Sequence, residues 1–528
     1  MVNSDRIDRL FETLNRRDSP GCAVGIYQNG EIVHSRGYGQ ANLEHGAPIT
    51  PETVFHVASL SKQFTAFSVG LLARTRAISL DSPLRTYIPE LPSALPVTFR
   101  QVIHHVSGLR DQWDLLRLAG WRHADLKTDD DILGLAARQT ALNFPSGSRF
   151  QYINTGYTLM GIAIARVTGM SLRQFAARNI FEPLGMKQTW FHDDYNEIVN
   201  GRAEAYSAVE GDALKRNMPA YQTVGPTGLF STVSDFARWD SNFLSPVVGD
   251  EEFIRSLTAP VTFESGHVSN YGFGLIANNY RGLVTAEHAG GDAGFRSFYL
   301  RFPAERLGIA VFCNFSEIKP AELARNIADI CLEGKFQSDD RNLPAWAGRG
   351  AGVTAPDRRT LEDRCGTWRD SITGMTCRIE MRGARMILIG TAATEYELIP
   401  ADAARFQFTG IDAECVFVAE SGRMIIRYAG QQAADCERAE EGTPDPNPVP
   451  LSEYPGTYYS GELDVRYRVD LVNDRLTLQR PKHPLETLDR LSSDEFSSSR
   501  EGFHIRFVKD GLVLTAERVW NLAFDRVA

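Results

Sequence analysis

The chain is short of lysine, of basic clusters and of long apolar runs, and each shortage narrows what the protein can be. Its 528 residues carry 56 Lys and Arg against 66 Asp and Glu, a net charge of −10. Positive residues are not gathered in one segment, which argues against nucleic acid or an anionic membrane surface as a partner. No apolar run reaches the ~18 residues of a membrane span. The balance of charge favours a soluble protein.

Cysteine is scarce and scattered. The seven cysteines are odd in number and include no pair at metal-ligand spacing, so we expect free thiols in a reducing compartment and neither a disulfide framework nor a metal or other cofactor. His104 and His105 are adjacent and would point to different faces, so we interpret them as structural. Residues 1–8 lack the apolar core of a secretory signal, which predicts the cytoplasm. The cysteines are Cys22, Cys313, Cys331, Cys365, Cys377, Cys415 and Cys436.

Three short motifs occur in an informative order: Ser-Leu-Ser-Lys at 59–62, Tyr-Ile-Asn at 152–154 and His-Ala-Gly at 288–290. Each alone is weak. With 33 Ser and 8 Lys, chance gives about half of one Ser-x-x-Lys, and a second does occur at 316–319 without the other two motifs after it. The first copy opens a stretch with apolar residues at helical spacing, so we expect a helix to begin near the serine.

This arrangement suits covalent catalysis by a serine. Ser59 and Lys62, three positions apart on a helix, are neighbours, and the helix N-terminus adds partial positive charge. A serine hydroxyl needs a base to become nucleophilic, and a lysine can serve if burial and nearby charges keep it partly neutral. Tyr152 is the candidate for passing the proton to the leaving group. The pattern therefore predicts a serine hydrolase with these three catalytic residues.

The other motif residues suit substrate binding. Asn154 would offer its amide to the substrate carbonyl and the lysine, and His288 would supply a hydrogen bond or positive charge on the opposite wall. Backbone N–H groups of Ser59 and Gly291 could form an oxyanion hole, since Gly290 and Gly291 allow close approach. Taken singly, each motif has a structural interpretation: the first as a helix cap with a solvated lysine, the second as a turn and the third as a structural histidine. Their order favours the catalytic reading.

The three motifs resemble those of the penicillin-binding protein and serine β-lactamase superfamily, the class C-like serine hydrolases. Tyr in the second motif and His in the third are similar to the branch that contains D-aminopeptidases, D,D-carboxypeptidases and esterases. The resemblance spans roughly residues 5–335 and implies an α/β fold with an antiparallel sheet flanked by helices. His288 stands where β-lactamases commonly carry Lys, which makes penicillin breakdown the less expected activity.

Elements at both ends of residues 1–335, the predicted catalytic domain, support that fold. Residues 22–35 predict a hairpin around Asn29-Gly30, and residues 295–302 and 309–313 predict another antiparallel pair. Mostly helical patterns lie between them, so one sheet should be completed by the first and last strands.

The rest of the chain reads as two similar units. Composition indicates linkers at 336–357 and 441–450, which leaves β domains at 358–440 and 451–528. Identical or similar residues recur 90 positions apart and period-two alternation surrounds turn residues, so each unit is predicted to be a small antiparallel β-barrel. The matching positions include Gly366, Thr367, Trp368, Arg385 and Leu388 against Gly456, Thr457, Tyr458, Arg475 and Leu478.

A catalytic domain followed by two β units resembles the D-stereospecific aminopeptidases, and this implies that a loop of the last barrel reaches the cleft. The candidate is residues 479–486, with Arg480, Lys482 and His483. Alternatively the barrels serve only packing or assembly as a homodimer. We expect a cytoplasmic serine peptidase that releases N-terminal D-residues from short peptides, amides or esters through an acyl-enzyme. The alternatives are an esterase or D,D-peptidase with the same catalytic residues, and a non-catalytic binding protein.

Overall fold

The computed structural model describes most of the chain and both predicted β units. Residues 338–355 and 440–448, which contain most of the two predicted linkers, lie outside the described ranges. The structure describes residues 3–209, 213–266, 268–337, 356–390, 394–408, 413–419, 421–428, 431–439, 449–498 and 500–527.

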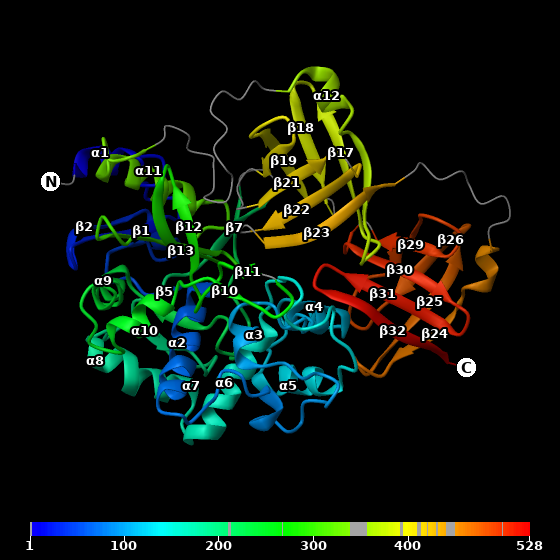
Figure 1. The fold of residues 1–528 in the computed structure, drawn as a ribbon, viewed down its shortest axis with the longest axis horizontal. Helices are drawn as coiled ribbons and strands as arrows, with labels where there is room; N and C mark the ends of the chain where they lie inside the picture. The colour runs from blue at the N-terminus through cyan, green and yellow to red at the C-terminus, as the bar shows by residue number, and fades with distance from the viewer. Residues whose placement is uncertain are drawn as a thin grey trace.

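A six-stranded antiparallel sheet organises the first part of the chain (Figure 1). Strand β1 lies between β2 and β15, so both ends of this region complete one sheet, as predicted. The turn between β1 and β2 places Asn29 and Gly30 at φ 57° and 87°, which a tight two-residue hairpin requires. In sheet order the strands are β12 (Ile276–Tyr280), β13 (Leu283–Asp292), β14 (Phe295–Phe302), β15 (Leu307–Cys313), β1 (Cys22–Gln28) and β2 (Glu31–Tyr38).

Alternating side chains of this sheet enter two separate hydrophobic cores. On β1, Val24 and Ile26 pack in the core shared with helices α1 (Ser4–Arg9) and α11 (Pro320–Cys331). Tyr27, one position on, belongs to the larger core on the other face. Period-two alternation in a strand that is buried on both sides produces this division.

The larger core holds the helical part of the protein. Its centre is α2, which packs against α6 and α7 and whose first turn carries Lys62. Ser59 lies in a short 3₁₀ turn, η1 (Ala58–Leu60), directly before that helix, so the predicted helix start is displaced by two residues. The helices are α2 (Ser61–Arg74), α3 (Phe99–Ile103), α4 (Gln112–Leu118), α5 (Asp129–Arg138), α6 (Thr155–Thr168), α7 (Leu172–Ala176), α8 (Glu182–Leu184), α9 (Val233–Asn242) and α10 (Glu251–Ser256).

Short strands and turns connect these helices. One three-stranded sheet joins β5, β9 and β6 next to the turn that carries Ser59. None of the helices in the described ranges is long and apolar enough to cross a bilayer. The short elements are β3 (Gln40–Asn42), β4 (Ala47–Pro48), β5 (Phe55–His56), η2 (Leu84–Thr86), η3 (Ala177–Phe181), β6 (Trp190–Phe191), β7 (Tyr206–Ala208), β8 (Leu214–Arg216), β9 (Leu229–Ser231), β10 (Val261–Thr262) and β11 (Val268–Ser269).

The first β unit, which follows helix α12 (Arg358–Glu362), is a closed antiparallel barrel. Its core is formed by side chains such as Trp368, Phe406 and Met424. The strands are β16 (Gly366–Asp370), β17 (Thr376–Arg382), β18 (Arg385–Ile389), β19 (Glu395–Pro400), β20 (Arg405–Phe408), β21 (Ala413–Val418), β22 (Arg423–Tyr428) and β23 (Gln431–Arg438).

The second unit is a nine-stranded, nearly closed barrel. Its β24 and β26 begin 90 positions after β16 and β18, so the sequence repeat corresponds to equivalent strands. After a short turn, η6 (Leu451–Glu453), the strands are β24 (Gly456–Ser460), β25 (Val465–Val472), β26 (Arg475–Gln479), β27 (Glu486–Thr487), β28 (Asp489–Arg490), β29 (Glu495–Ser498), β30 (Phe503–Val508), β31 (Gly511–Ala516) and β32 (Val519–Val527).

This second barrel shares a hydrophobic core with α4 and α5. Leu115 and Leu118 pack in one cluster with barrel residues such as Tyr467, whose hydroxyl donates to the Leu118 carbonyl at 2.6 Å. Arg110, almost fully buried, pairs with Glu462 of the barrel and donates to the Trp520 carbonyl at 2.9 Å. The second barrel is therefore part of the wall around the helical region, and Figure 1 shows β31 and β32 beside α4.

Candidate active site

The Ser59 hydroxyl and the Lys62 amine form the centre of the site. Lys62 Nζ lies 3.1 Å from Ser59 Oγ, 2.9 Å from Asn154 Oδ1 and 2.9 Å from the Pro226 carbonyl oxygen. The turn before α2 and the first turn of that helix bring the first pair together. The loop before α6 brings Asn154. The first two sequence motifs therefore meet at one nitrogen atom.

Lys62 is completely buried, and its surroundings disfavour the charged form. Burial lowers the pKa of Lys62 well below its usual 10.5, and the positive charge of Arg518 lowers it further, against the opposing effect of Asp111 and Asp292. The Tyr152 ring centroid lies 4.7 Å from Nζ. A lysine that is partly neutral at ordinary pH can accept a proton from a neighbouring hydroxyl.

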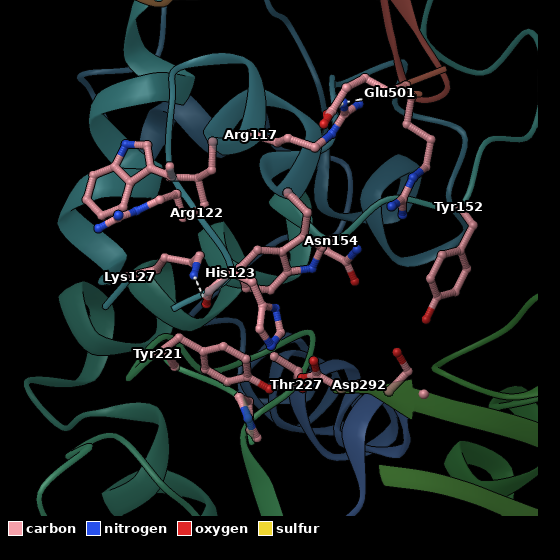
Figure 2. Close-up of a pocket in the computed structure, with 18 of the residues that line it drawn as sticks. Arg117, Arg122, His123, Lys127, Tyr152, Asn154, Tyr221, Thr227, Asp292 and Glu501 are labelled. Atoms are coloured by element: carbon pink, nitrogen blue, oxygen red, sulfur yellow. Dashed lines mark hydrogen bonds and ion pairs between the residues drawn. The ribbon is translucent and has the colours of Figure 1, made fainter. Parts of the chain in front are cut away.

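Tyr152 is held in place by an aromatic cluster. The ring of His105 lies 4.3 Å from the Tyr152 ring, centroid to centroid, and His288 lies at 6.1 Å. Burial, with Lys62 adding to it, lowers the pKa of His105 well below 6.5, so the neutral ring accepts a hydrogen bond from the Ile153 N–H at 3.2 Å. Figure 2 shows the Tyr152 hydroxyl directed into the cavity. His105, interpreted from sequence as structural, thus supports the tyrosine.

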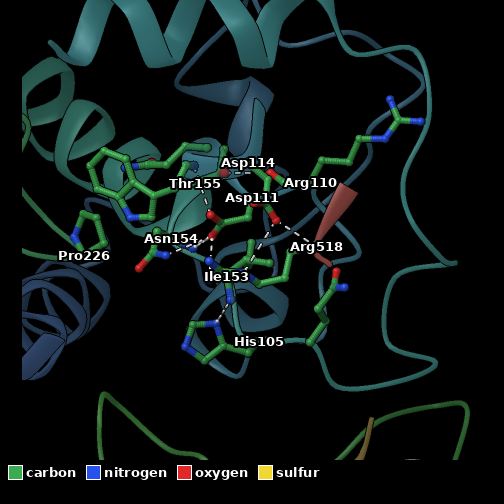
Figure 3. A network of polar contacts seen from close by, with 12 residues as sticks. His105, Arg110, Asp111, Asp114, Ile153, Asn154, Thr155, Pro226 and Arg518 are labelled. Carbon is green, nitrogen blue, oxygen red and sulfur yellow. Dashed lines mark hydrogen bonds and ion pairs between the residues drawn. The ribbon is translucent and has the colours of Figure 1, made fainter. Parts of the chain in front are cut away.

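A buried carboxylate fixes the orientation of Asn154 (Figure 3). Asp111 Oδ2 accepts hydrogen bonds from the Asn154 backbone N–H at 2.7 Å and from its side-chain Nδ2 at 2.9 Å. Arg518 Nη1 lies 3.3 Å from the same oxygen. Since the amide nitrogen is committed to Asp111, the amide oxygen is left for Lys62. The described chain of contacts runs from Arg518 through Asp111 and Asn154 to the lysine.

The third motif lies on β13, and both ring nitrogens of its histidine contact neighbouring protein groups. His288 Nε2 lies 2.7 Å from the Tyr271 hydroxyl, and Nδ1 lies 2.6 Å from the Ala289 carbonyl. Burial and the nearby Lys62 lower the pKa of His288 to about 3. The depressed pKa favours the neutral ring, so of the two expected contributions, a hydrogen bond or a positive charge, the structure favours the hydrogen bond. Arg518 supplies a positive charge at the cavity instead.

The glycines of the third motif allow β13 to lie against the turn that carries Ser59. A Cβ on Gly290 would lie 2.5 Å from the Val57 carbonyl oxygen and 2.2 Å from Ser297 Oγ, closer than atoms can approach. Gly291, on the alternate face, lines the cavity together with Ser59. The geometry agrees with the predicted close backbone approach at Gly290, whereas a Cβ on Gly291 would meet its nearest atom at 3.7 Å.

A cavity of about 540 Å³ opens in front of Ser59, and two parts of the chain enclose it (Figure 2). Tyr152, Asn154, Tyr221 and Asp292 line it from the first part of the chain. The second barrel contributes His483, Glu501 and Arg518. The cavity therefore brings together residues as far apart in the sequence as Tyr152 and Arg518, which are separated by 366 positions.

The predicted loop at 479–486 reaches the cavity only through its tip. His483 lines the cavity, and Lys482 Nζ lies 3.2 Å from Asp125 Oδ2 at its margin. Arg480 is fully buried between Glu486 and Glu501, with 3.1 Å to the latter. Arg480, directly after β26, thus turns inward into buried ion pairs, so within the proposed specificity loop Lys482 and His483 are the residues at the cavity.

We expect substitutions in this loop to separate stability from specificity. Arg480→Ala leaves Glu486 buried and unpaired, so it should lower the stability by about 3 kcal/mol. His483→Ala, at the tip, should change the melting temperature little and widen the range of accepted side chains. Thermal unfolding and rates on small and bulky anilides measure both. Equal melting temperatures for the two variants would contradict the assignment.

Sequence reasoning missed the partners that come from distant segments. Arg518 lies in the turn between β31 and β32, and Asp111 is the N-terminal cap of α4, where its Oδ1 accepts the Trp113 N–H at 3.0 Å. The sequence around Arg518 contains no motif that marks this residue as part of a site.

Comparison with known proteins gives the class. The beta-lactamase family model matches residues 7–332, and the chain belongs to that family. Within it, the chain is similar to the D-aminopeptidase of Gluconobacter oxydans, 26% identical over 87% of this chain and 83% of that protein. It is also similar to the D-aminopeptidase of Brucella anthropi, 28% identical over 78% of this chain and 77% of that protein.

One solved structure extends the likeness to most of the fold. The octameric penicillin-binding protein homologue from Pyrococcus abyssi is 23% identical, and the match has a TM-score of 0.57 and covers 82% of this chain and 99% of that chain. At this identity the likeness concerns the fold alone. It agrees with the predicted superfamily architecture.

Proposed function

We propose that this protein is a serine hydrolase that releases N-terminal D-amino acids from short peptides, amides or esters. The observation that carries the proposal is the completely buried Lys62, with a depressed pKa, 3.1 Å from the half-buried Ser59 hydroxyl at the cavity. This is the arrangement of an activated nucleophile. The names of the similar proteins from Gluconobacter and Brucella support the substrate class.

The proposed reaction forms and breaks one ester. Ser59 Oγ attacks the carbonyl carbon while its proton passes to Lys62 Nζ, and backbone N–H groups of Ser59 and Gly291 face the developing oxyanion. Tyr152 delivers a proton to the departing amine as the carbon–nitrogen bond breaks. Lys62 then returns its proton to Tyr152, which leaves the lysine amine neutral again. Water attacks the ester carbonyl and gives its proton to Lys62. As the ester carbon–oxygen bond breaks, that proton passes to Ser59 Oγ, and the amino acid is released.

The second barrel is proposed to limit the size of the substrate. His483, Glu501 and Arg518 of this barrel line the cavity, and Figure 2 shows Glu501 on the side opposite Asp292 of β13. A cavity of about 540 Å³ suits one or two residues better than a long polypeptide. The cytoplasmic location and a homodimer stay predictions, which cell fractionation and light scattering measure.

We expect D-alanine p-nitroanilide to be hydrolysed at least ~100-fold faster, in kcat/KM, than its L-isomer. Binding of the amine, side chain and carbonyl at three fixed positions leaves only one configuration with the carbonyl at Ser59. A panel of paired anilides and benzyl esters, with Ser59→Ala as the control for background hydrolysis, measures the preference. Cleavage of esters alone would favour an esterase, and a preference for L-isomers would contradict the proposal.

A further inference from the structure

Asp292 ends the strand that carries the third motif, and its side chain borders the cavity. It lies two positions after Gly290, so both face the same side of β13. That side rests against Val57 and Ala58, next to the nucleophile. The Asp292 side chain is 24% exposed. The Asp292 carboxylate therefore lines the same cavity as Ser59, and Figure 2 shows it near Tyr221 and Thr227.

Among the described residues, the protein's contacts with this carboxylate all go to one of its two oxygens. Asp292 Oδ2 lies 3.0 Å from His56 Nε2 and 3.3 Å from Thr227 Oγ1, and it also accepts the Tyr221 hydroxyl. In the part of the chain that the structure describes, Oδ1 has no hydrogen-bond partner. Burial raises the pKa of Asp292, but the hydrogen bond and charge of His56 outweigh it, so the pKa lies below 3.8. The group is anionic and retains an open oxygen.

The other cavity charges are already matched. Glu501, the second carboxylate among the lining residues, lies 2.9 Å from Arg117 and 3.1 Å from Arg480. Arg518 is paired with Asp111. Lys62 has a depressed pKa and its own three oxygen neighbours. Lys127 Nζ, at the same cavity, donates to the His123 and Asp125 carbonyl oxygens at 2.9 and 2.6 Å. Asp292 is thus the lining carboxylate with capacity for a cation.

We propose that Asp292 binds the α-ammonium group of the substrate's N-terminal residue. The inference rests on the proposed function and names its amine-recognition residue. In an acyl group esterified to Ser59, the α-nitrogen lies three bonds from Oγ, within reach of a side chain on the adjacent strand. A charge-assisted hydrogen bond at a partly buried carboxylate favours the ammonium over a neutral group. The requirement for a free N-terminus then resides in the first part of the chain, and the 482–483 tip only limits size.

The test compares two anilides that differ only in the amine. D-Alanine p-nitroanilide and propionyl p-nitroanilide share the leaving group and the carbon skeleton. We expect the wild-type enzyme to prefer the former by at least ~100-fold in kcat/KM, and Asp292→Asn, which retains size and hydrogen bonding, to reduce that ratio below ~5-fold. Glu501→Gln is the matched control and should keep the wild-type ratio.

Other outcomes overturn the assignment. If Asp292 serves only to hold His56, Asp292→Asn slows both anilides equally and the ratio stays at its wild-type value. Circular dichroism checks the fold of the variant. The wild-type enzyme gives an independent measurement: 1-aminoethylboronic acid should inhibit at least ~30-fold more tightly than ethylboronic acid, and equal inhibition would exclude an ammonium site. Failure to cleave either anilide contradicts the proposed function itself, whereas cleavage with an unchanged ratio in the variant contradicts the ammonium site alone.

Discussion

Replacing Lys62 with methionine is expected to lower kcat/KM by at least ~10³-fold on D-alanine p-nitroanilide. The variant keeps the length of a side chain that is completely buried but removes the base 3.1 Å from Ser59 Oγ. Lys319→Met, in the second Ser-x-x-Lys at 316–319, is the matched control because Lys319 is exposed and pairs with Glu322. Its rate should equal that of the wild type.

The same Lys62→Met substitution, which lowers the rate, should raise the free energy of unfolding at neutral pH. The depressed pKa of Lys62 means that the unfolded chain binds a proton that the folded chain lacks. Unfolding free energy therefore rises with pH up to about 10.5, and Lys62→Met should lose this slope and be more stable at neutral pH. Denaturant unfolding at several pH values measures it. A less stable Lys62→Met protein would contradict this, because it would show that the hydrogen bonds of the amine stabilise the folded state.

Covalent labelling gives the complementary result. An acylating inhibitor should form an adduct on Ser59, and mass spectrometry of the digest locates it. Ser59→Ala and Tyr152→Phe should each lower kcat by at least ~10²-fold, with double variants far from additive because the residues act as a unit. An adduct on Ser316 would reject the nucleophile, and a Tyr152→Phe enzyme with near-wild-type rates would reject the proton transfer.

Substitution of Arg518 by methionine is expected to lower kcat/KM at pH 7 by about 10²-fold. The charge of Arg518 helps to keep the pKa of Lys62 low, and without it that pKa rises. The acid limb of the pH–rate profile should therefore move to higher pH, where part of the lost rate returns. The variant also leaves the fully buried Asp111 without its cation, which should cost about 2 kcal/mol.

A matched control lies in the same barrel. Arg468 is exposed and pairs locally with Asp470 at 2.9 Å, so Arg468→Met should change neither the pH profile nor the melting temperature appreciably. An Arg518→Met enzyme whose profile superposes on the wild type, at whatever rate, would show that the arginine only anchors the barrel.

Local geometry explains which parts of the site could be predicted from sequence. Ser59 and Lys62 are three residues apart at a helix start, so the chain itself sets their distance. The sheet and both barrels follow from period-two alternation, turn residues and the 90-residue repeat. Arg518, Asp111 and Asp292 could not be found this way, because each gains its role from a segment that packs against it in three dimensions.

Two residues of the predicted site have side-chain partners that the sequence pattern did not indicate. His288 and Arg480 were expected to act because of their chemistry, but both side chains turn inward. His288 meets Tyr271 and its own strand, and Arg480 meets Glu486 and Glu501. A pattern of residue types identifies groups able to react, whereas the direction of each side chain depends on partners that the pattern does not contain.

The wall that the second barrel contributes has a consequence for synthesis on the ribosome. Tyr152, the last of the three proposed catalytic residues, emerges 366 positions before Arg518. At roughly 5–20 residues per second, about 20–70 s pass between the synthesis of Tyr152 and that of Arg518. Throughout this time the chain contains all three proposed catalytic residues but lacks the barrel wall of the cavity. During that time Leu115 and Leu118 face water instead of the barrel core. The newborn enzyme is thus expected to be inactive and to need a chaperone until the hairpin of β31 and β32 docks.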